Sequence, residues 1–586
     1  SAGFHEENEE GAKLERQIVE TINSVGGSLI GPNCIGVLTN HYSGVFTSPI
    51  PELNPQGVDL ISGSGATALF IMDSGMQKGI KFNSMYSVGN SAQLGVEEIL
   101  EYMDESFDPK TSSRVKLLYV ESIEKPEKLL KHASSLIRKG CRIAAVKSGG
   151  SAAGSRAASS HTGALASSDV AVEALFRKAG IVRCNGRDEL MTVAGIFMHP
   201  EMKGRNMAVV THAGGPAVML TDALSNGGMD VPHIEGEKAQ ELLAKLFAGS
   251  SVGNPIDFLA TGTAEQLGYI LDACDQDFDN IDGMAVIFGS PGLFPVFDVY
   301  RVLDEKMKTS KKPIFPIFPS SKIVKDEIAE FVSKGRVYFP DEVLFGNALC
   351  KIYKTPAPQP EHFEMPDMDV KKIREVVDNA QNGYLSPDEI HTLLDAAGVA
   401  RAKEGVSDNE EEIVKMAKEI GFPLVMKVVG PIHKSDVGGV VLNVSDEETV
   451  RREFKRMMQI KDTYAIMLAQ QLSGTQVFIG AKRDDKFGHM VLCGLGGIFI
   501  EVLKDVKAGL APMSKDEAHG MIKELNKIIQ GVRGQEPVNE DKFAEAVMRI
   551  SALVKVAPEI FEMDLNPLLG NKDNVVAVDA RIRIEK

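Results

Sequence analysis

Residues 58–76 read VDLISGSGATALFIMDSGM, a mostly apolar run followed by a Gly-Ser-Gly turn and then by apolar residues at helical spacing. The same order returns at 207–224, where an apolar run leads into THAGG and a second helical pattern. Further short apolar runs of the kind that parallel sheets bury occur at 115–120, 143–146, 284–288 and 314–318. This alternation of strands and helices predicts two α/β domains, each built on a parallel sheet.

Length and composition limit the classes of protein to which the chain can belong. Its 586 residues exceed what one hydrophobic core holds, so we expect roughly three to five domains. A net charge of −17 argues against non-specific nucleic-acid binding, and no apolar run is long enough to span a membrane. The six cysteines form no CxxC pair, which argues against a disulfide framework or a zinc site and indicates a reducing, cytoplasmic compartment.

The two ends of the chain differ from this middle part. A helical pattern to Ile22 and a strand-like stretch at 28–30 cannot bury a core alone, so we expect the front of that first domain to be missing. Residues 355–370 are rich in proline and charge and predict a linker. Beyond them the run SPDE at 386–389 predicts a helix start. Strands between helices then indicate an α+β region with an antiparallel sheet.

His161 lies in the run SRAASSHTGALA at 155–166, where small neighbours leave its ring open to a close ligand. A neutral imidazole is a capable nucleophile at neutral pH, and its phosphorylated form is a high-energy carrier. The alternative is a loop histidine that only forms local hydrogen bonds. The local sequence leaves both interpretations open.

The turns after the two leading strands are candidates for phosphate binding. A helix N-terminus offers unpaired N–H groups and the positive end of the helix dipole. Two such helix starts, at Ser64-Gly65 and at Gly214-Gly215, would suit a phosphorylated side chain if they converged on it. The alternative is that these turns serve only to connect strands tightly to helices.

Lys427 interrupts the apolar strand expected at 424–429, which is costly unless the ammonium meets an anion such as a nucleotide phosphate. The run GPIHKSDVGG follows at 430–439, and it could fold over a nucleotide with His433 near the phosphates and Gly438 and Gly439 beside it. An edge-strand lysine with an exposed loop is the alternative interpretation.

Two further stretches supply oxygen ligands. EMDLNPL at 562–568 contains Asn566, and VDAR at 578–581 contains Asp579. Carboxylate and amide oxygens are the ligands that Mg²⁺ prefers, although acids on strands more often face solvent. A strand lysine, a glycine-rich loop and paired oxygen ligands, in this order, outline an ATP-grasp nucleotide site.

Taken together, these residues resemble the ADP-forming (nucleoside-diphosphate-forming) acyl-CoA synthetases in their fused form, a family related to succinyl-CoA synthetase. The combination of HTGA at 161–164 with HKSDVGG at 433–439 is the most specific part of this resemblance. The matching stretches cover essentially the whole chain, at 1–4, 31–34, 62–66, 87–90, 119–121, 159–166, 254–257, 433–440, 494–497, 531–534, 564–568 and 579–581.

The resemblance implies an α/β multidomain protein. It implies a partial Rossmann-like CoA-binding domain at 1–50 and a flavodoxin-like domain with the catalytic histidine at 51–197. A second flavodoxin-like domain at 198–355 would follow, then a linker at 356–365 and a C-terminal ATP-grasp domain at 366–586.

The resemblance also implies a reaction and a set of roles. A small-molecule carboxylate, ATP and CoA would give acyl-CoA, ADP and phosphate reversibly, with Mg²⁺ as cofactor and a homo-oligomer, a dimer, as the assembly. His161 would carry the phosphate, Glu121 would hold its ring, and His433 would shuttle phosphate to the nucleotide. The remaining implied contacts are the phosphate cradle of Ser64, Gly65, Gly214 and Gly215, the nucleotide contacts Lys427, Gly438 and Gly439, the CoA and acyl contacts Asn33 and Cys34, and the Mg²⁺ ligands Asn566 and Asp579.

Two rival functions differ from this one. The first is a catalytically altered module of the same family that senses CoA and nucleotide for regulation, against which the presence of both His161 and His433 argues. The second is a different ATP-grasp ligase that works through a free acyl phosphate, which would need neither histidine nor the two α/β domains.

Overall fold

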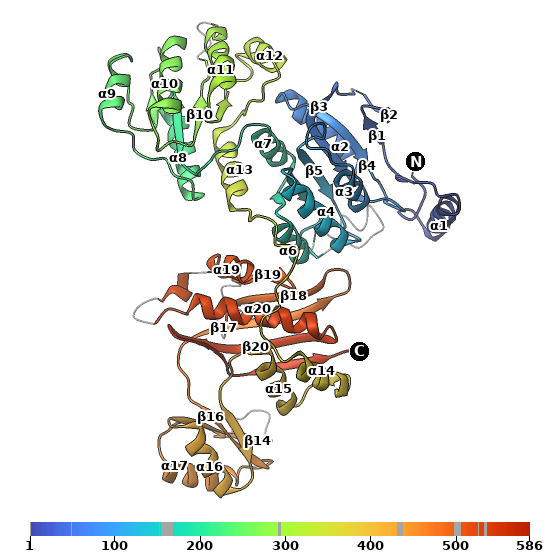
Figure 1. The fold of residues 1–586 in the computed structure, drawn as a ribbon, viewed down its shortest axis with the longest axis vertical. Helices are drawn as coiled ribbons and strands as arrows, with labels where there is room; N and C mark the ends of the chain where they lie inside the picture. Colours follow the sequence, from blue (N-terminus) through green and yellow to red (C-terminus); the bar gives the residue numbers. More distant parts are fainter. Residues whose placement is uncertain are drawn as a thin grey trace. The chain divides into compact units, whose positions relative to one another are not determined.

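The computed structural model describes residues 2–48, 50–151, 153, 168–290, 295–430, 438–496, 505–525, 527–531 and 536–586. The chain divides into two compact units, Ser1–Gln359 and Pro360–Lys586 (Figure 1). The division falls inside the stretch predicted as the linker, 356–365, although the individual domain limits stay predictions. Within the described ranges, no helix is both long and apolar enough to cross a membrane.

A seven-stranded sheet forms the first part of unit 1, in the order β2-β1-β4-β3-β5-β6-β7. Five of its strands are parallel, as the alternating pattern predicted: β3 (Leu53–Ser62), β4 (Phe82–Ser87), β5 (Val115–Val120), β6 (Arg142–Lys147) and β7 (Val182–Cys184). The helices that follow these strands are α2 (Gly65–Gln77), α3 (Val96–Glu105), α4 (Pro126–Arg138), α6 (Asp169–Ala179) and α7 (Arg187–Phe197).

The first fifty residues contribute to this sheet. Helix α1 spans Glu9–Ser24, and the antiparallel hairpin of β1 (Gly36–Thr39) and β2 (Tyr42–Val45) extends the sheet beyond β4. The strand expected at 28–30 is reduced to one bridge between Ile30 and Leu94. A domain boundary at residue 50 would therefore separate the β1–β2 hairpin from the sheet to which it is hydrogen-bonded.

The second part of unit 1 is a four-stranded parallel sheet, as predicted, in the order β11-β10-β8-β9. Its strands are β8 (Met207–Thr211), β9 (Ile256–Asp257), β10 (Gly283–Ile287) and β11 (Ile314–Ile317). Its helices are α8 (Gly214–Asn226), α9 (Glu237–Leu243), α10 (Ala264–Gln276), α11 (Phe297–Thr309), α12 (Lys325–Ser333) and α13 (Glu342–Lys354). Helix α13 packs against both α8 and α7, so one hydrophobic core joins the two sheets.

Unit 2 contains two antiparallel sheets, where the α+β pattern predicted an antiparallel sheet. The smaller has the order β13-β16-β14-β15 and consists of β13 (Glu404–Ser407), β16 (Ala465–Gln470), β14 (Leu424–Val429) and β15 (Val440–Val444). The first of its two helices, α16 (Glu410–Ile420), packs against β13 and β16, and the second, α17 (Glu447–Met457), against β14 and β15.

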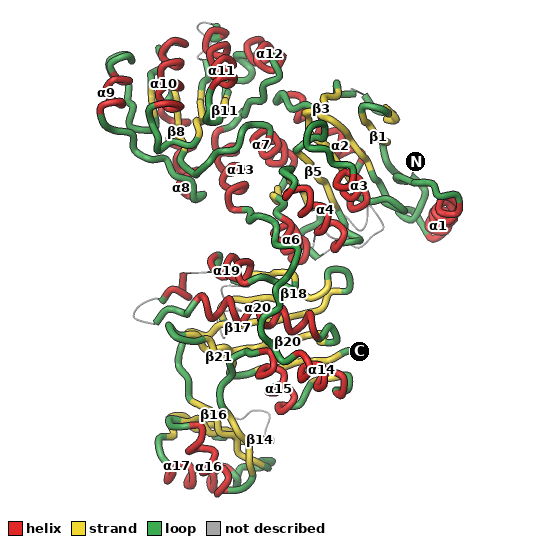
Figure 2. Tube along the Cα trace, in the orientation of Figure 1, coloured by secondary structure: helices red, strands yellow, loops and turns green. Residues whose placement is uncertain are grey.

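The larger sheet of unit 2 has the order β12-β22-β20-β17-β18-β19, with β21 paired to β20. Its strands are β12 (Gly383–Tyr384), β17 (Thr475–Asp484), β18 (Gly488–Leu495), β19 (Val506–Leu510), β20 (Ile560–Gly570), β21 (Val575–Ala577) and β22 (Ala580–Ile584). Helix α20 (Glu540–Val556) lies across one face of this sheet (Figure 2). The other helices of unit 2 are α14 (Val370–Asn379), α15 (Pro387–Ala397), α19 (Lys515–Lys523) and the 3₁₀ helix at Lys527–Gln530.

Helix α15 begins where the sequence predicted. Ser386 is its N-cap, Pro387 its first residue, and the Glu389 carboxylate accepts from the Ser386 N–H at 2.8 Å. This reciprocal capping satisfies N–H groups that lack partners inside the helix. Gly398, with a φ of 69°, ends the helix in the left-handed conformation.

Candidate nucleotide and phosphate sites

The first helix start in unit 1 is built around a serine turn. The Ser62 hydroxyl at the end of β3 donates to the Ser64 carbonyl at 2.7 Å, and the Ser64 side chain caps α2 by accepting from the Thr67 N–H at 3.4 Å. A Cβ at Gly65 would come within 2.5 Å of the Ile35 side chain. Only glycine therefore fits there, and α2 begins with N–H groups that can meet an anion.

The second helix start repeats this turn with threonine in place of serine. The Thr211 hydroxyl at the end of β8 donates to the Ala213 carbonyl at 2.8 Å and accepts from the Ala213 N–H at 3.0 Å. Helix α8 then begins at Gly214, whose Cβ position faces the Asp257 carboxylate at 3.6 Å, while a Cβ at Gly215 would meet nothing within 4 Å. The two predicted cradle turns thus share one hydrogen-bonding pattern.

The turn with the predicted CoA and acyl contacts lies beside the first helix start. Asn33 adopts a left-handed φ of 54°, and the Asn90 N–H donates to the Pro32 carbonyl at 2.9 Å. Cys34 is a partly exposed free thiol. Because Ile35 continues this turn and contacts the α2 start, the structure brings the Asn33 and Cys34 backbone next to Gly65.

Glu121 follows directly after β5, the strand beside β3, so its carboxylate belongs to the same sheet edge as Ser64. The Tyr119 hydroxyl donates to Glu121 Oε1 at 3.3 Å, and the Gly63 N–H donates to the Tyr119 carbonyl at 3.0 Å. Parallel strands meet at their carboxyl ends, which is where α/β sheets bind ligands. This edge therefore gathers Glu121 and the α2 helix start.

His212, in the THAGG turn, had no role in the sequence interpretation. Its ring stacks on Phe288 with centroids 4.3 Å apart, and its Nδ1 lies 3.4 Å from the Ile287 carbonyl. Burial lowers its pKa, while the bond to Ile287 and the charge of Asp257 oppose that shift. The sequence could have marked His212 as a candidate site residue, because it lies within a turn already predicted to bind phosphate.

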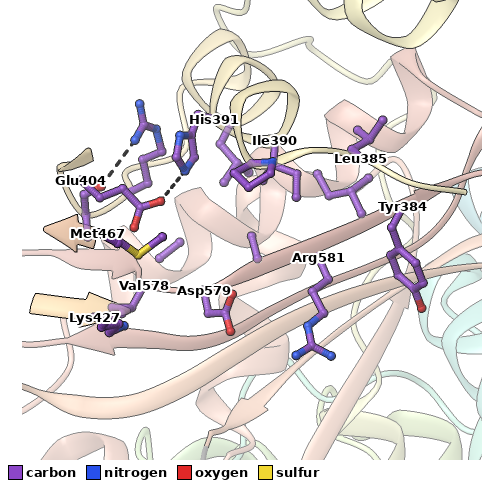
Figure 3. Close-up of a pocket in the computed structure, with 17 residues that line it drawn as sticks. Tyr384, Leu385, Ile390, His391, Glu404, Lys427, Met467, Val578, Asp579 and Arg581 are labelled. Atoms are coloured by element: carbon purple, nitrogen blue, oxygen red, sulfur yellow. Dashed lines mark hydrogen bonds and ion pairs between the residues drawn. The ribbon is translucent and has the colours of Figure 1, made fainter. Parts of the chain in front are cut away.

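In unit 2 a pocket of about 570 Å³ brings Lys427 and Asp579 together. Figure 3 shows Lys427, Asp579 and Arg581 along the strands on one side, with His391 and Glu404 on another. Lys427 is half-buried on β14, and no ion pair of its ammonium is present among the described residues. The full lining is Tyr384, Leu385, Pro387, Ile390, His391, Leu394, Arg401, Ala402, Glu404, Lys427, Met467, Ala577, Val578, Asp579, Ala580, Arg581 and Ile582.

The predicted Mg²⁺ ligands are neighbours, Asn566 on β20 and Asp579 in the turn between β21 and β22. The Asn566 N–H donates to the Asp579 carbonyl at 3.2 Å, and Asp564 lies opposite Arg581 in the β20–β22 register. Alternation along β20 and β22 places Asp564, Asn566 and Arg581 on one face, opposite the buried Leu565, and Asp579 lies directly before β22. Two carboxylates and an amide oxygen are a donor set that suits Mg²⁺.

Asp564 is a candidate ligand that the sequence interpretation did not assign, although it lies two residues before Asn566. Burial raises its pKa, Arg581 lowers it, and the charges of Asp579 and Glu562 raise it. Burial is the main cause of the shift, and the two neighbouring acids add to it. A bound divalent cation would offset the negative charge of these acids. The period-two alternation of the strand could have identified it.

Other lining residues were missed because they lie in no motif. His391 of α15 and Glu404 of β13 form an ion pair with 2.5 Å between His391 Nε2 and Glu404 Oε1. Tyr384 donates its hydroxyl to Glu562 at 2.9 Å. These residues reach the pocket through tertiary packing, so no local pattern marks them.

The predicted glycine contacts lie beside Lys427 but not in the pocket lining. Val440 pairs with Lys427 across β14 and β15, and the Val428 N–H donates to the Gly439 carbonyl at 2.9 Å. Gly438 has a left-handed φ of 68°. His161 and His433 lie outside the described residues.

Comparison with known proteins identifies a family domain in each unit. A succinyl-CoA ligase-like flavodoxin domain matches residues 55–197, and an ATP-grasp domain matches residues 376–584. The ADP-forming acetate–CoA ligase I of Archaeoglobus fulgidus is 32% identical, over 99% of this chain and 86% of the relative. The ADP-forming 4-hydroxybutyrate–CoA ligase of Nitrosopumilus maritimus is 30% identical, over 97% of this chain and 84% of the relative.

A solved structure shares the fold. The dinucleotide-forming acetyl-coenzyme A synthetase 1 of Ca. Korarchaeum cryptofilum, in complex with phosphate and ADP, is 24% identical with a TM-score of 0.54. The match covers 60% of this chain and 75% of that chain. The family inferred from the motifs, the flavodoxin-like domain and the ATP-grasp domain are therefore confirmed. The chain belongs to the ADP-forming acetate–CoA ligase family, in the fused form that carries a succinyl-CoA ligase-like domain and an ATP-grasp domain in one polypeptide.

Proposed function

We propose that this member of the family converts a carboxylate, ATP and CoA reversibly into acyl-CoA, ADP and phosphate. The observation that carries the proposal is the meeting of Lys427 and Asp579 in one pocket of the ATP-grasp unit, with Asn566 hydrogen-bonded to Asp579. A cation and a pair of oxygen ligands are what a nucleotide triphosphate with its metal requires. The relatives named above carry the same type of activity in their names.

In this proposal His161 carries the phosphoryl group. In the direction of ATP synthesis, an imidazole nitrogen of His161 attacks the phosphorus of an acyl phosphate. The bond from phosphorus to the carboxylate oxygen breaks, and the free carboxylate leaves. Glu121 accepts a hydrogen bond from the other ring nitrogen and fixes the tautomer. The N–H groups at Ser64-Gly65 and Gly214-Gly215 bind the phosphoryl oxygens.

At the nucleotide end, a ring nitrogen of His433 attacks the phosphorus that His161 carries, and the bond from phosphorus to His161 breaks. A terminal phosphate oxygen of ADP then attacks the same phosphorus, and the bond to His433 breaks. Lys427 with the Gly438 and Gly439 backbone holds the nucleotide phosphates. Asn566 and Asp579 would hold Mg²⁺, with Asp564 beside them. The ion, when bound, offsets negative charge on the phosphate oxygens. The Lys427 ammonium adds a second positive charge at the nucleotide phosphates. It would hold them in the orientation that transfer of the phosphoryl group requires.

The remaining parts of the proposal follow from the resemblance. Asn33 and Cys34 border the place where the CoA sulfur meets the acyl phosphate, and residues 1–50 belong to a CoA-binding domain. The assembly is a homo-oligomer, a dimer, located in the cytoplasm. The relatives named above are all ligases or synthetases, so the regulatory alternative gains no support from them.

A product assay tests the reaction. Purified protein is incubated with ATP, Mg²⁺, CoA and one carboxylate at a time: acetate, a branched acid, an aryl acid, 4-hydroxybutyrate and a dicarboxylate. We expect at least one acid to give equal amounts of acyl-CoA and ADP, and without CoA no more ADP than the amount that phosphorylates the enzyme once. Formation of AMP and pyrophosphate, or ADP release that ignores CoA, would contradict the proposal.

A further inference from the structure

The hydroxyl of Tyr119 lies between two parts of the proposed phosphohistidine site. It donates to Glu121 Oε1 at 3.3 Å on one side. On the other side, Ser148 and Thr67 lie close enough to the phenol to lower its pKa. Thr67 belongs to the first turn of α2 and donates its own hydroxyl to Ser64 Oγ at 3.0 Å. Tyr119 therefore links Glu121, which its hydroxyl contacts, to the turn before α2, where the Gly63 N–H donates to its carbonyl.

The backbone around Tyr119 fixes this link. Its carbonyl accepts from the Gly63 N–H at 3.0 Å, and the Ser148 N–H donates to the Val120 carbonyl at 3.0 Å. The side chain is half-buried. Burial raises the pKa of Tyr119, hydrogen bonds with Ser148 and Thr67 lower it, and the Glu121 carboxylate raises it. The phenol thus stays protonated at neutral pH and can donate to Glu121.

We infer that Tyr119 is a positioning residue, which aims the Glu121 carboxylate and holds it in register with the N-terminus of α2. This inference rests on the proposed function, in which Glu121 orients the phosphorylated histidine and α2 binds the phosphoryl oxygens. A carboxylate with one oxygen tied to the phenol keeps its other oxygen for the imidazole. A small displacement of the Glu121 carboxylate should slow phosphoryl transfer, because this reaction depends on how the reacting groups are positioned.

Tyr119→Phe tests the inference, because it removes the hydroxyl and leaves the ring. The rate of acid-labile phosphoenzyme formation from γ-labelled ATP is measured by rapid quench, together with kcat and KM for ATP. We expect the phosphorylation rate and kcat to fall about tenfold, the scale of one hydrogen bond to a charged group. The KM for ATP stays unchanged, because the proposed nucleotide contacts are in unit 2.

Tyr86→Phe is the matched control. Tyr86 lies on β4 of the same sheet and is also half-buried, but it lines a different pocket together with Asp59 and Tyr102. The rate of phosphoenzyme formation in Tyr86→Phe should stay within twofold of the wild-type rate. Equal losses in both variants, a Tyr119→Phe rate within twofold of the wild type, or a change in KM for ATP alone would overturn the inference.

Thr67→Val adds a second variant, which removes the hydroxyl at the α2 end of the same link. If the link acts as one unit, the double variant loses less than the product of the two single losses. A loss equal to that product would overturn the inference. A wild-type protein that forms no acid-labile phosphoenzyme would instead refute the proposed function, before any variant is compared.

Discussion

Replacement of Lys427 by methionine separates a binding lysine from a structural one. The ammonium of Lys427 forms no ion pair with any residue that the structure describes, and its backbone pairs with Met467 and Val440 survive the substitution. Methionine keeps the apolar stem of the side chain. We therefore expect the free energy of unfolding of the nucleotide-free protein to change by less than about 0.5 kcal/mol.

The effect of Lys427→Met should instead appear as a lower affinity for ATP. A hydrogen bond to a charged group contributes about 2 kcal/mol, so the dissociation constant for ATP should rise roughly 30-fold in Lys427→Met. Calorimetric titration with ATP and Mg²⁺ measures this rise, and a thermal melt without nucleotide checks stability. Lys415→Met is the control, since the side chain of Lys415 on α16 is 79% exposed. An ATP affinity within threefold of the wild type, or a large drop in melting temperature, would refute the reasoning.

Three further changes test other parts of the molecule. Lys116→Met leaves the Asp59 carboxylate buried without its 2.5 Å partner, which should lower the free energy of unfolding by about 3 kcal/mol in a urea titration. Asp579→Asn removes one carboxylate of the proposed Mg²⁺ pair and should raise the Mg²⁺ concentration for half-maximal activity about tenfold or more, while an unchanged requirement would count against the pair. Burial lowers the pKa of His199 from 6.5 to about 4, so the unfolded chain takes up its proton first as pH falls. Stability should then drop by roughly 3 kcal/mol between pH 6.5 and pH 4, and His199→Gln should remove that part of the pH dependence in urea titrations.

Features with local signals could be predicted from the sequence. The start of α15 follows from a serine, a proline and an acid within a few residues, and the two glycine turns follow directly after apolar runs. The parallel sheets of unit 1 and the antiparallel sheets of unit 2 follow from how strands alternate with helices. Lys427 could be selected because a lysine inside an apolar strand needs a reason to be there.

Features that depend on long-range pairing could not be predicted in the same way. Lys116 also interrupts an apolar run, but its partner Asp59 is set by the register between β3 and β5. The antiparallel contact of the β1–β2 hairpin with β4 is likewise a long-range pairing that no local pattern marks. His391 and Glu404 enter the pocket from α15 and β13, which only the tertiary structure brings together.

The phosphorylated histidine is the central claim, and labelling tests it most directly. The protein is incubated with γ-labelled ATP and Mg²⁺, denatured, and exposed to acid or to base. We predict a label that acid removes and base leaves, mapped by peptide analysis to the His161 peptide and absent from that peptide in His161→Ala. An undiminished label in His161→Ala would contradict the account.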